Sequence, residues 1–287
     1  MYSGEPRWNT PIIRLDKISR QYKANIYAKL ETGNPTCSHK DRESAMIIVD
    51  MRKKGFKKVA CASTGNAAIS LAAFAWANGF AADIFVCKKI REEKLKLLRM
   101  FAPTIHMVDG DFEDAVNALL DFLDKEKSVY NANAGYCEAK LIGNSYIGME
   151  LAEQLKPDYV ICPTNNGTLL VGVWLGLKKK DVRAKMVAAV ASNTQIADSI
   201  AGFHKLEGDK ITQTIQESEG YVIEVSDEEI ARATIALAKE GVICEPASAA
   251  SLAAVEHLEI GENASVCCII TGSGMKYPEL MSKVLHT

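Results

Sequence analysis

The chain has 287 residues, 48% of them hydrophobic and 24% charged, with a formal net charge of -2 at pH 7. This length suffices for one large or two ordinary α/β domains, and the near balance of charge argues against a basic surface for nucleic acid or a membrane. No apolar run is long enough to span a bilayer, and the first residues lack the basic start and apolar centre of a secretory signal. We therefore expect a cytoplasmic protein with no nucleic-acid or membrane partner.

The cysteines do not form a metal-binding or disulfide pattern. Eight are present, scattered singly apart from the adjacent Cys267 and Cys268, and none has Cys-x-x-Cys spacing. This distribution argues against zinc and against a disulfide framework. We expect small buried hydrophobic side chains in a reducing compartment, and no metal site.

Short apolar segments alternate with helical patterns through the first half of the chain. The expected strands are 25–30, 58–63, 82–87 and 104–108. The expected helices are 40–54, 66–76, 91–101 and 112–123. Strands alternating with helices of this length indicate βαβ units in a parallel, doubly wound sheet.

The same alternation continues through the second half. The expected strands are 159–162, 186–190 and 266–270, and the expected helices are 140–155, 169–178, one beginning near Asp227, and 247–257. The segment 202–220 is polar and weakly patterned, so we expect it to be the most mobile loop. The predicted fold class is α/β, with two doubly wound open-sheet domains.

The most informative stretch is 33–44, which places Lys40 between a turn and a helix. Gly33, Asn34 and Pro35 break regular structure, so Lys40 should lie near the start of the following helix. The positive end of a helix lowers the pKa of a lysine and favours the neutral amine, which is the form that attacks a carbonyl. Lys40 is thus a candidate imine-forming nucleophile. The alternative is an ordinary solvated lysine.

Three strand-to-turn junctions support a ligand site. Residues 63–66, 164–168 and 271–274 each place glycines and small polar side chains at the carboxyl end of a predicted strand. Open α/β sheets bind ligands at that edge, and a helix start there offers N–H groups to a phosphate or carboxylate. Each junction alone could be ordinary loop chemistry.

Six motifs resemble the fold type II pyridoxal-phosphate (PLP) enzymes, most closely the threonine synthase family. They are Gly4-Glu5 with Asn9–Leu15 at the start of the chain, 34–42 around Lys40, Ala62–Asn66, Val108–Ala115, Glu245–Ser251 and Thr271–Lys276. The matches follow the family's order along nearly the whole chain. The resemblance implies a tryptophan synthase β-subunit-like fold, a PLP cofactor, an amino-acid substrate and a homodimer.

The resemblance also implies a role for individual residues. Lys40 would hold the cofactor covalently and move protons on the substrate, and Thr271 would meet the pyridine nitrogen. Asn66 would hydrogen-bond the ring oxygen. The cofactor phosphate would be cradled by Asn165, Asn166, Gly167 and Thr168, and the substrate carboxylate would be held by Ser63, Thr64, Gly65 and Asn66.

The chain departs from the family pattern at Cys37, where the family has glycine, and at His39, where it has phenylalanine. Either the turn at Cys37 needs no positive φ or its thiol faces the active site, and we favour the first. His39 could approach the cofactor phosphate, as the resemblance to the tryptophan synthase β subunit implies, or it could simply pack.

A further departure concerns the substrate. Residues 131–143 lack the family's phosphate-binding pattern, and Lys140 lies where an arginine is usual. Lysine can bind phosphate as a point charge but not as a bidentate fork. We take Lys140 as a candidate residue for binding the substrate phosphate.

The leading functional hypothesis is a PLP-dependent carbon–oxygen lyase resembling threonine synthase, which would convert O-phosphohomoserine and water to L-threonine and phosphate. Alternatives are a serine/threonine dehydratase, an O-phosphoserine β-replacement enzyme, or a non-catalytic PLP-binding paralogue. A plain nucleotide-binding protein is disfavoured because no Gly-x-Gly-x-x-Gly follows the first strand. The expected domains are a larger one, 1–35 with 133–287, and a smaller inserted one, 36–132, with the site in a cleft between them.

Overall fold

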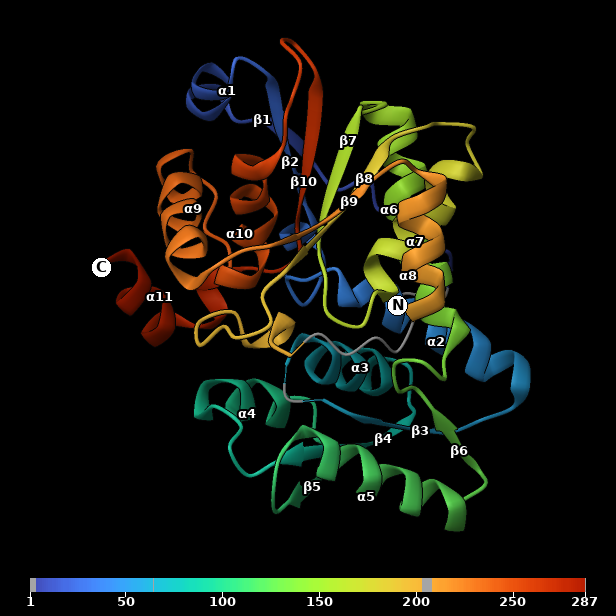
Figure 1. Ribbon diagram of the computed structural model, residues 1–287. Coiled ribbons are helices and arrows are strands. Elements are labelled where there is room, and N and C mark those ends of the chain that lie inside the picture. The colour runs from blue at the N-terminus through green and yellow to red at the C-terminus, as the bar shows by residue number, and fades with distance from the viewer. Residues whose placement is uncertain (1–3, 64, 203–207, 287) are drawn as a thin grey trace. The chain divides into compact units, whose positions relative to one another are not determined.

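The computed structural model describes residues 4–63, 65–202 and 208–286, and the chain divides into two compact units (Figure 1). The smaller unit comprises Met1–Pro6 and Lys40–Gly143, and the larger comprises Arg7–His39 and Asn144–Thr287. These boundaries differ from those expected at 36 and 132. Residues 37–39 belong to the larger unit because their backbone hydrogen-bonds with 271–273, including a bridge between Ser38 and Gly272.

The smaller unit is built on a parallel four-stranded sheet of order β5-β4-β3-β6. Its strands are β3 (Lys58–Ala62), β4 (Ala81–Cys87), β5 (Thr104–Val108) and β6 (Val129–Asn131). Its helices are α2 (Lys40–Lys54), α3 (Asn66–Ala77), α4 (Glu92–Arg99) and α5 (Phe112–Lys125). Figure 1 shows α3 on one side of this sheet and α5 on the other.

Helix α5 illustrates why the helices of the smaller unit could be predicted from the sequence. Asp111 caps the helix by accepting hydrogen bonds from the backbone of Glu113 and Asp114, and the Asp114 carboxylate accepts from the Asp111 N–H in return. The apolar face then packs Ala115 and Leu119 against Ala60 and other sheet residues. Cap and periodicity are both local features, so this helix could be predicted from the sequence alone.

The larger unit is built on a six-stranded sheet of order β1-β2-β10-β7-β8-β9, in which only the β1–β2 pair is antiparallel. Its strands are β1 (Ile12–Arg14), β2 (Asn25–Leu30), β7 (Tyr159–Pro163), β8 (Lys185–Val190), β9 (Tyr221–Glu224) and β10 (Ser265–Ile270). Its α-helices are α1 (Asp16–Tyr22), α7 (Thr168–Lys178), α8 (Gly208–Glu217), α9 (Asp227–Lys239), α10 (Pro246–Ala253) and α11 (Pro278–Leu285). The division between the units falls within α6 (Glu138–Gln154). This parallel α/β architecture confirms the predicted fold class.

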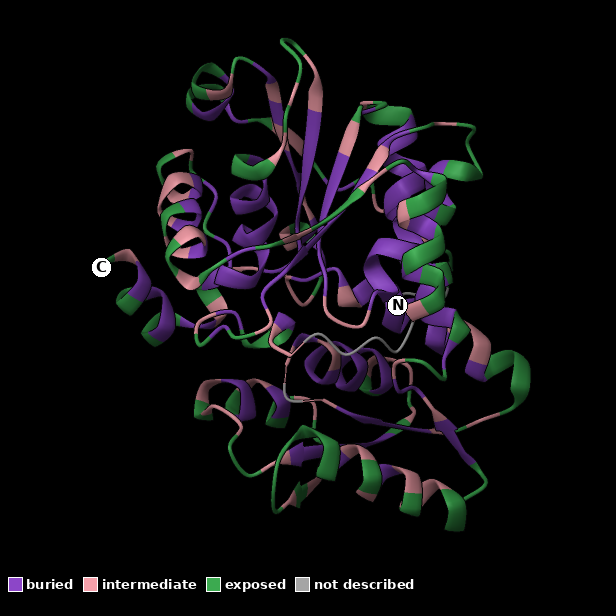
Figure 2. Cartoon of the chain, in the orientation of Figure 1, coloured by how far each residue is buried: buried purple, intermediate pink, exposed green. Residues whose placement is uncertain are grey.

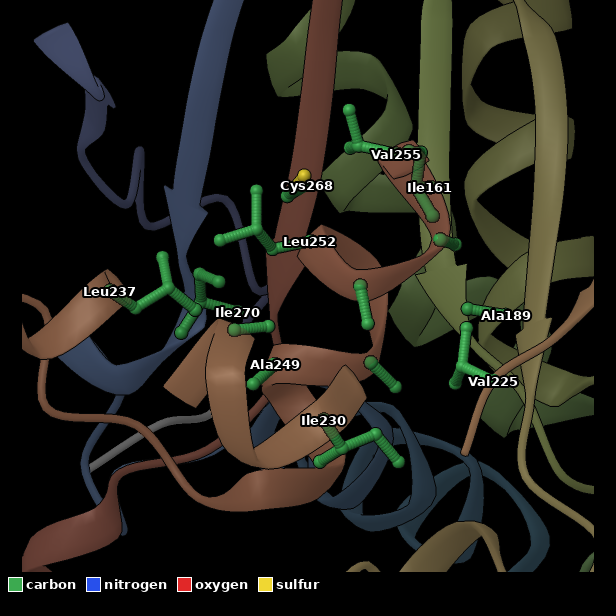
Figure 3. Packing of buried hydrophobic residues seen from close by; sticks show 14 of the residues in the cluster. Ile161, Ala189, Val225, Ile230, Leu237, Ala249, Leu252, Val255, Cys268 and Ile270 are labelled. Atoms are coloured by element: carbon green, nitrogen blue, oxygen red, sulfur yellow. The ribbon is translucent and has the colours of Figure 1, made fainter. Parts of the chain in front are cut away.

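The core of the larger unit fixes the carboxyl ends of its central strands. Strands β7, β8 and β10 are buried along most of their length (Figure 2). Ile270 of β10 lies in one apolar cluster with Leu237 of α9 and Leu252 of α10 (Figure 3). Figure 1 shows α9 and α10 on one side of the sheet and α7 and α8 on the other. A sheet covered on both sides holds its strand ends rigidly in place.

Helices α6 and α7 meet through two glycines. A Cβ on Gly176 would overlap the Ser145 carbonyl oxygen, and one on Gly148 would overlap the Val173 carbonyl oxygen. The two backbones therefore approach more closely than any larger residue permits. This contact fixes α7, whose first residue, Thr168, is a candidate site residue.

The expectation of a mobile loop over 202–220 is wrong for Gly208–Glu217, which form α8. Ile211 and Thr214 are buried on one face of this helix, and the Glu217 carboxylate accepts hydrogen bonds from Lys178 and Trp174 of α7. The apolar positions are few and spaced by a helical turn, and the polar residues between them obscured that pattern. Residues 203–207 lie outside the described residues.

Across 4–63, 65–202 and 208–286, the structure contains no helix whose length and apolar character would let it cross a membrane.

We expect Gly176→Ala to lower the free energy of unfolding by about 2–3 kcal/mol, because the new methyl group would overlap the backbone of α6. Urea denaturation measures this change. The control is Gly261→Ala, where an added Cβ meets nothing within 4 Å and the change should stay within about 0.5 kcal/mol. Equal stability of the two variants would contradict this packing.

Candidate active site

Lys40 is the first residue of α2 and is held by a carboxylate one turn along the same helix. Its Nζ lies 2.7 Å from Glu43 Oε1, and the two side chains are 20% and 2% exposed. Residues three apart lie on one helix face, so this contact follows from the helix itself. The Lys40 ammonium donates a charge-assisted hydrogen bond to this carboxylate.

Lys140 reaches the same carboxylate from another helix. Its Nζ lies 3.7 Å from Glu43 Oε2, and its side chain is 9% exposed. Gly143, one turn further along α6, allows this approach because a Cβ there would overlap the Arg42 carbonyl oxygen. The smaller unit therefore brings the predicted residues Lys40 and Lys140 together around Glu43.

Cys61, at the end of β3, does not add a nucleophile to this group. Burial raises the pKa of its thiol to about 11, the effect of the Lys140 ammonium being the smaller one. The thiol therefore stays protonated near neutral pH. Lys40 remains the candidate nucleophile of the smaller unit.

Residues 63–66 link β3 to α3 and offer groups suited to a carboxylate. Ser63 Oγ accepts a hydrogen bond from the Gly65 N–H, and Asn66, which is buried, begins the twelve-residue α3. The start of such a helix attracts anions. Lys94 of α4 is also buried, with its Nζ 3.9 Å from the place a Cβ on Gly65 would take. Thr64 lies outside the described residues.

The turn between β7 and α7 forms the predicted phosphate cradle of the larger unit. Gly167 has a φ of 89° and caps α7 without a side-chain hydrogen bond, a conformation that glycine adopts without strain. Asn166 Oδ1 accepts from both the N–H and the hydroxyl of Thr168. Asn165 Nδ2 donates to the carbonyl oxygens of Ser199 and Ala201. These bonds fix the turn at the start of α7.

Thr271, directly after β10, belongs to a chain of hydroxyl groups. Its Oγ1 lies 2.8 Å from Ser248 Oγ, which accepts a hydrogen bond from the Gly272 N–H. The Glu245 carboxylate is 3.5 Å from the same Thr271 hydroxyl. His39 donates its backbone N–H to the Thr271 carbonyl oxygen and is buried beside it. The larger unit thus brings His39 and Thr271 together.

The segment before Lys40 overturns the expectation for Cys37, whose φ is 59°. The turn does need a positive φ, and cysteine occupies the place of the family's glycine at a steric cost. The conformation is imposed by pairing, because the Cys37 N–H donates to Asn34 O and the Cys37 carbonyl accepts from the Ser273 N–H. Ser38 Oγ is fully buried and has no hydrogen-bond partner among the described residues.

Comparison with known proteins identifies the group to which these features belong. The family model described as "Pyridoxal-phosphate dependent enzyme" matches residues 5–272. The chain belongs to this family. It is a PLP-dependent lyase, as its threonine synthase relatives and its family indicate.

Two relatives illustrate the similarity in sequence. A threonine synthase of Bacillus sp. (strain ULM1) is 32% identical, covering 95% of this chain and 84% of the relative. A threonine synthase of Methanocaldococcus jannaschii is 30% identical, covering 94% of this chain and 75% of the relative. The recognition of a PLP enzyme resembling threonine synthase is therefore confirmed.

Solved structures support the fold. Maize serine racemase superposes with a TM-score of 0.85 at 21% identity, covering 97% of this chain and 92% of that chain. The processed threonine deaminase isoform 2 of Solanum lycopersicum gives the same TM-score and identity, covering 98% of this chain and 85% of that chain. At this identity the likeness concerns the fold alone.

The residues of the larger unit fit PLP. A glycine-capped helix start at Gly167 suits a phosphate, the Thr271 hydroxyl suits a ring nitrogen, and the buried hydroxyl of Ser38 offers a hydrogen-bonding group that the described residues do not satisfy. Lys40, in the smaller unit, would supply an amine for condensation with the cofactor aldehyde. These are the groups that would hold the cofactor.

Four residues of the candidate site were not identified from the sequence: Ser38, Glu43, Lys94 and Ser248. Glu43 could have been predicted from the sequence, since its spacing of three residues from Lys40 predicts a contact on a helix. Ser248 lies inside the Glu245–Ser251 motif, but nothing local indicates that it contacts Thr271. Lys94 has no sequence pattern that separates it from its exposed neighbour Lys96.

We expect Cys37→Gly to raise the free energy of unfolding by roughly 0.5–1 kcal/mol, because relief of the left-handed strain exceeds the entropy that glycine adds to the unfolded chain. Chemical denaturation of the cofactor-free protein checks this. Cys37→Ala removes the thiol but keeps the strain, so it should show no such gain. A gain in both variants would mean that the thiol, and not the backbone, is unfavourable.

Proposed function

We propose that this lyase acts on O-phosphohomoserine, converting it with water to L-threonine and phosphate. Its similarity to the two threonine synthases supports this reaction. The observation in the structure that carries the proposal is the hydroxyl pair of Thr271 and Ser248 at the end of β10. PLP, when bound, supplies a conjugated ring that accepts electrons from bonds at the α carbon of an amino acid.

The hydroxyl pair bears on the type of reaction. Ser248 accepts from the Gly272 N–H and can donate its own proton to Thr271. The Thr271 hydroxyl, which donates to the Glu245 carboxylate at 3.5 Å, would then turn its proton to the ring nitrogen. A hydroxyl donates a hydrogen bond there without transferring a proton, and this moderates the electron demand of the ring. Thr271 would therefore favour elimination and replacement at the β or γ carbon over transamination.

Lys40 would carry the proton transfers. It would take a proton from the α carbon and then one from the β carbon, after which the bond from the γ carbon to the phosphate oxygen breaks. The hydroxyl group of water then adds at the β carbon, and protons return to the γ and α carbons. Ser63, Gly65 and Asn66 would hold the substrate carboxylate, and Lys140 would orient the leaving phosphate.

A second candidate is elimination or replacement at the β carbon of serine, threonine or O-phosphoserine. The Glu43–Lys140 contact favours it, because the carboxylate cancels part of the charge with which Lys140 would bind a distal phosphate. The two candidates use the same cofactor and the same Lys40. Only the identity of the substrate separates them.

We expect borohydride treatment of the yellow, cofactor-loaded protein to attach the cofactor irreversibly at Lys40, because its Nζ is the proposed imine-forming amine. Peptide mass spectrometry locates the modified residue. Lys40→Ala should give no covalent adduct, whereas the exposed Lys96→Ala should behave as the unmodified protein does. Attachment at any other lysine would refute the assignment of Lys40.

We expect loaded protein mixed separately with O-phosphohomoserine, O-phosphoserine, threonine and serine to release threonine and phosphate from the first alone. Mass spectrometry of the products, together with a phosphate assay, gives the result. Lys40→Ala should yield no product from any of the four. Release of a 2-oxo acid and ammonia from serine or threonine would instead support the second candidate.

A further inference from the structure

Two buried charged side chains of the smaller unit, Glu43 and Lys140, form a group with the partly exposed Lys40. Glu43 Oε1 lies 2.7 Å from Lys40 Nζ, and Glu43 Oε2 lies 3.7 Å from Lys140 Nζ. The side chains of Glu43 and Lys140 are 2% and 9% exposed. One carboxylate thus serves two ammonium groups, each oxygen facing one of them.

The fold holds Glu43 in this position. The spacing of three residues keeps it on the same face of α2 as Lys40, and the close approach at Gly143 sets α6 against the Arg42–Glu43 backbone. A hydrogen bond of 2.7 Å between Ser44 and Ser70 ties α2 to α3. Glu43 cannot turn into solvent without taking its carboxylate away from the buried Lys140 ammonium, which is costly.

The arrangement determines the charge that a substrate meets at Lys140. When Lys40 carries the cofactor, the Glu43 carboxylate still lies 3.7 Å from the Lys140 Nζ and offsets part of its charge. A phosphate group bound by Lys140 must also approach the Glu43 carboxylate, which repels it. The pair therefore orients a phosphate group but binds it more weakly than Lys140 alone would.

We propose that Glu43 is a specificity-determining positioning residue, which sets the affinity of Lys140 for the phosphate of the substrate and of the product. This rests on the proposed function, in which Lys140 contacts the leaving phosphate. A weakened site lets inorganic phosphate depart after it is released. A weakened site also reduces the difference in affinity between phosphorylated and unphosphorylated substrates.

The test is Glu43→Gln, which keeps the shape of the side chain and removes its charge. Calorimetric titration of the cofactor-loaded protein with inorganic phosphate should show binding about tenfold tighter than in the unmodified protein. The matched control is Glu138→Gln, the same change at an exposed residue two positions before Lys140. Screening by solvent should leave its phosphate affinity within about twofold.

Two further measurements separate a charge effect from a structural one. In Glu43→Gln the KM for O-phosphohomoserine and the inhibition constant for phosphate should fall together by about tenfold, while the affinity for serine, measured by calorimetric titration, changes by less than about threefold. Adding Lys140→Met to Glu43→Gln should abolish the gain in phosphate affinity. A structural defect would raise KM for every substrate.

Unchanged phosphate affinity in Glu43→Gln, or an equal gain in Glu138→Gln, would overturn the proposal. If Glu43→Gln does not fold, Lys140→Met alone decides: it should weaken phosphate binding by about tenfold, and an unchanged affinity would refute a phosphate contact at Lys140. Titration of the cofactor-free protein distinguishes the failures. If borohydride leaves Lys40 unmodified, the proposed function is refuted. If Glu43→Gln still tightens phosphate binding in the cofactor-free protein, the effect of Glu43 on phosphate affinity at Lys140 stands independently of that function.

Discussion

A buried carboxylate must be neutralised where it lies, and in the smaller unit this requirement joins two helices. Glu43 is nearly inaccessible to water and contacts Lys40 on its own helix and Lys140 on α6. The desolvation of the buried Glu43–Lys140 pair is offset only if the two charges stay together, which favours one arrangement of α2 and α6. Gly143 makes that arrangement sterically possible. The start of α2 places the candidate nucleophile Lys40, and Glu43 links it to Lys140 of α6.

In the larger unit the candidate site consists mainly of neutral polar groups, which lie at the ends of buried strands. Strands β7 and β10 lie next to each other in the sheet, and both are followed by polar turns, at 164–167 and 271–273. The apolar cluster of Figure 3 keeps these strands rigid. Each turn can then hold an uncommon backbone conformation, such as the positive φ of Gly167. The packing of the strands and the hydrogen bonds of the turn keep the backbone in that conformation.

Much of the fold was predictable because its determinants are local. Strand Asn25–Leu30 and helix Lys40–Lys54 have the bounds that the sequence indicated, since apolar periodicity, caps and glycine breaks act within a few residues. Helix α8 was missed because it buries only a few side chains between polar ones. The short strand β1 was not predicted either, since its three residues form a strand only by pairing with β2.

For this protein the sequence by itself determined the family, the parallel α/β class and the position of Lys40 at a helix start, because each of these depends on short motifs and local periodicity. The tertiary structure alone decided which charges meet and which backbone positions are strained. Lys140 contacts Glu43 because two helices distant in the chain cross at a glycine. Cys37 adopts a left-handed conformation because its neighbours pair with residues near the end of the chain. No local pattern encodes such contacts, because their energy arises only when segments far apart in the sequence are packed together.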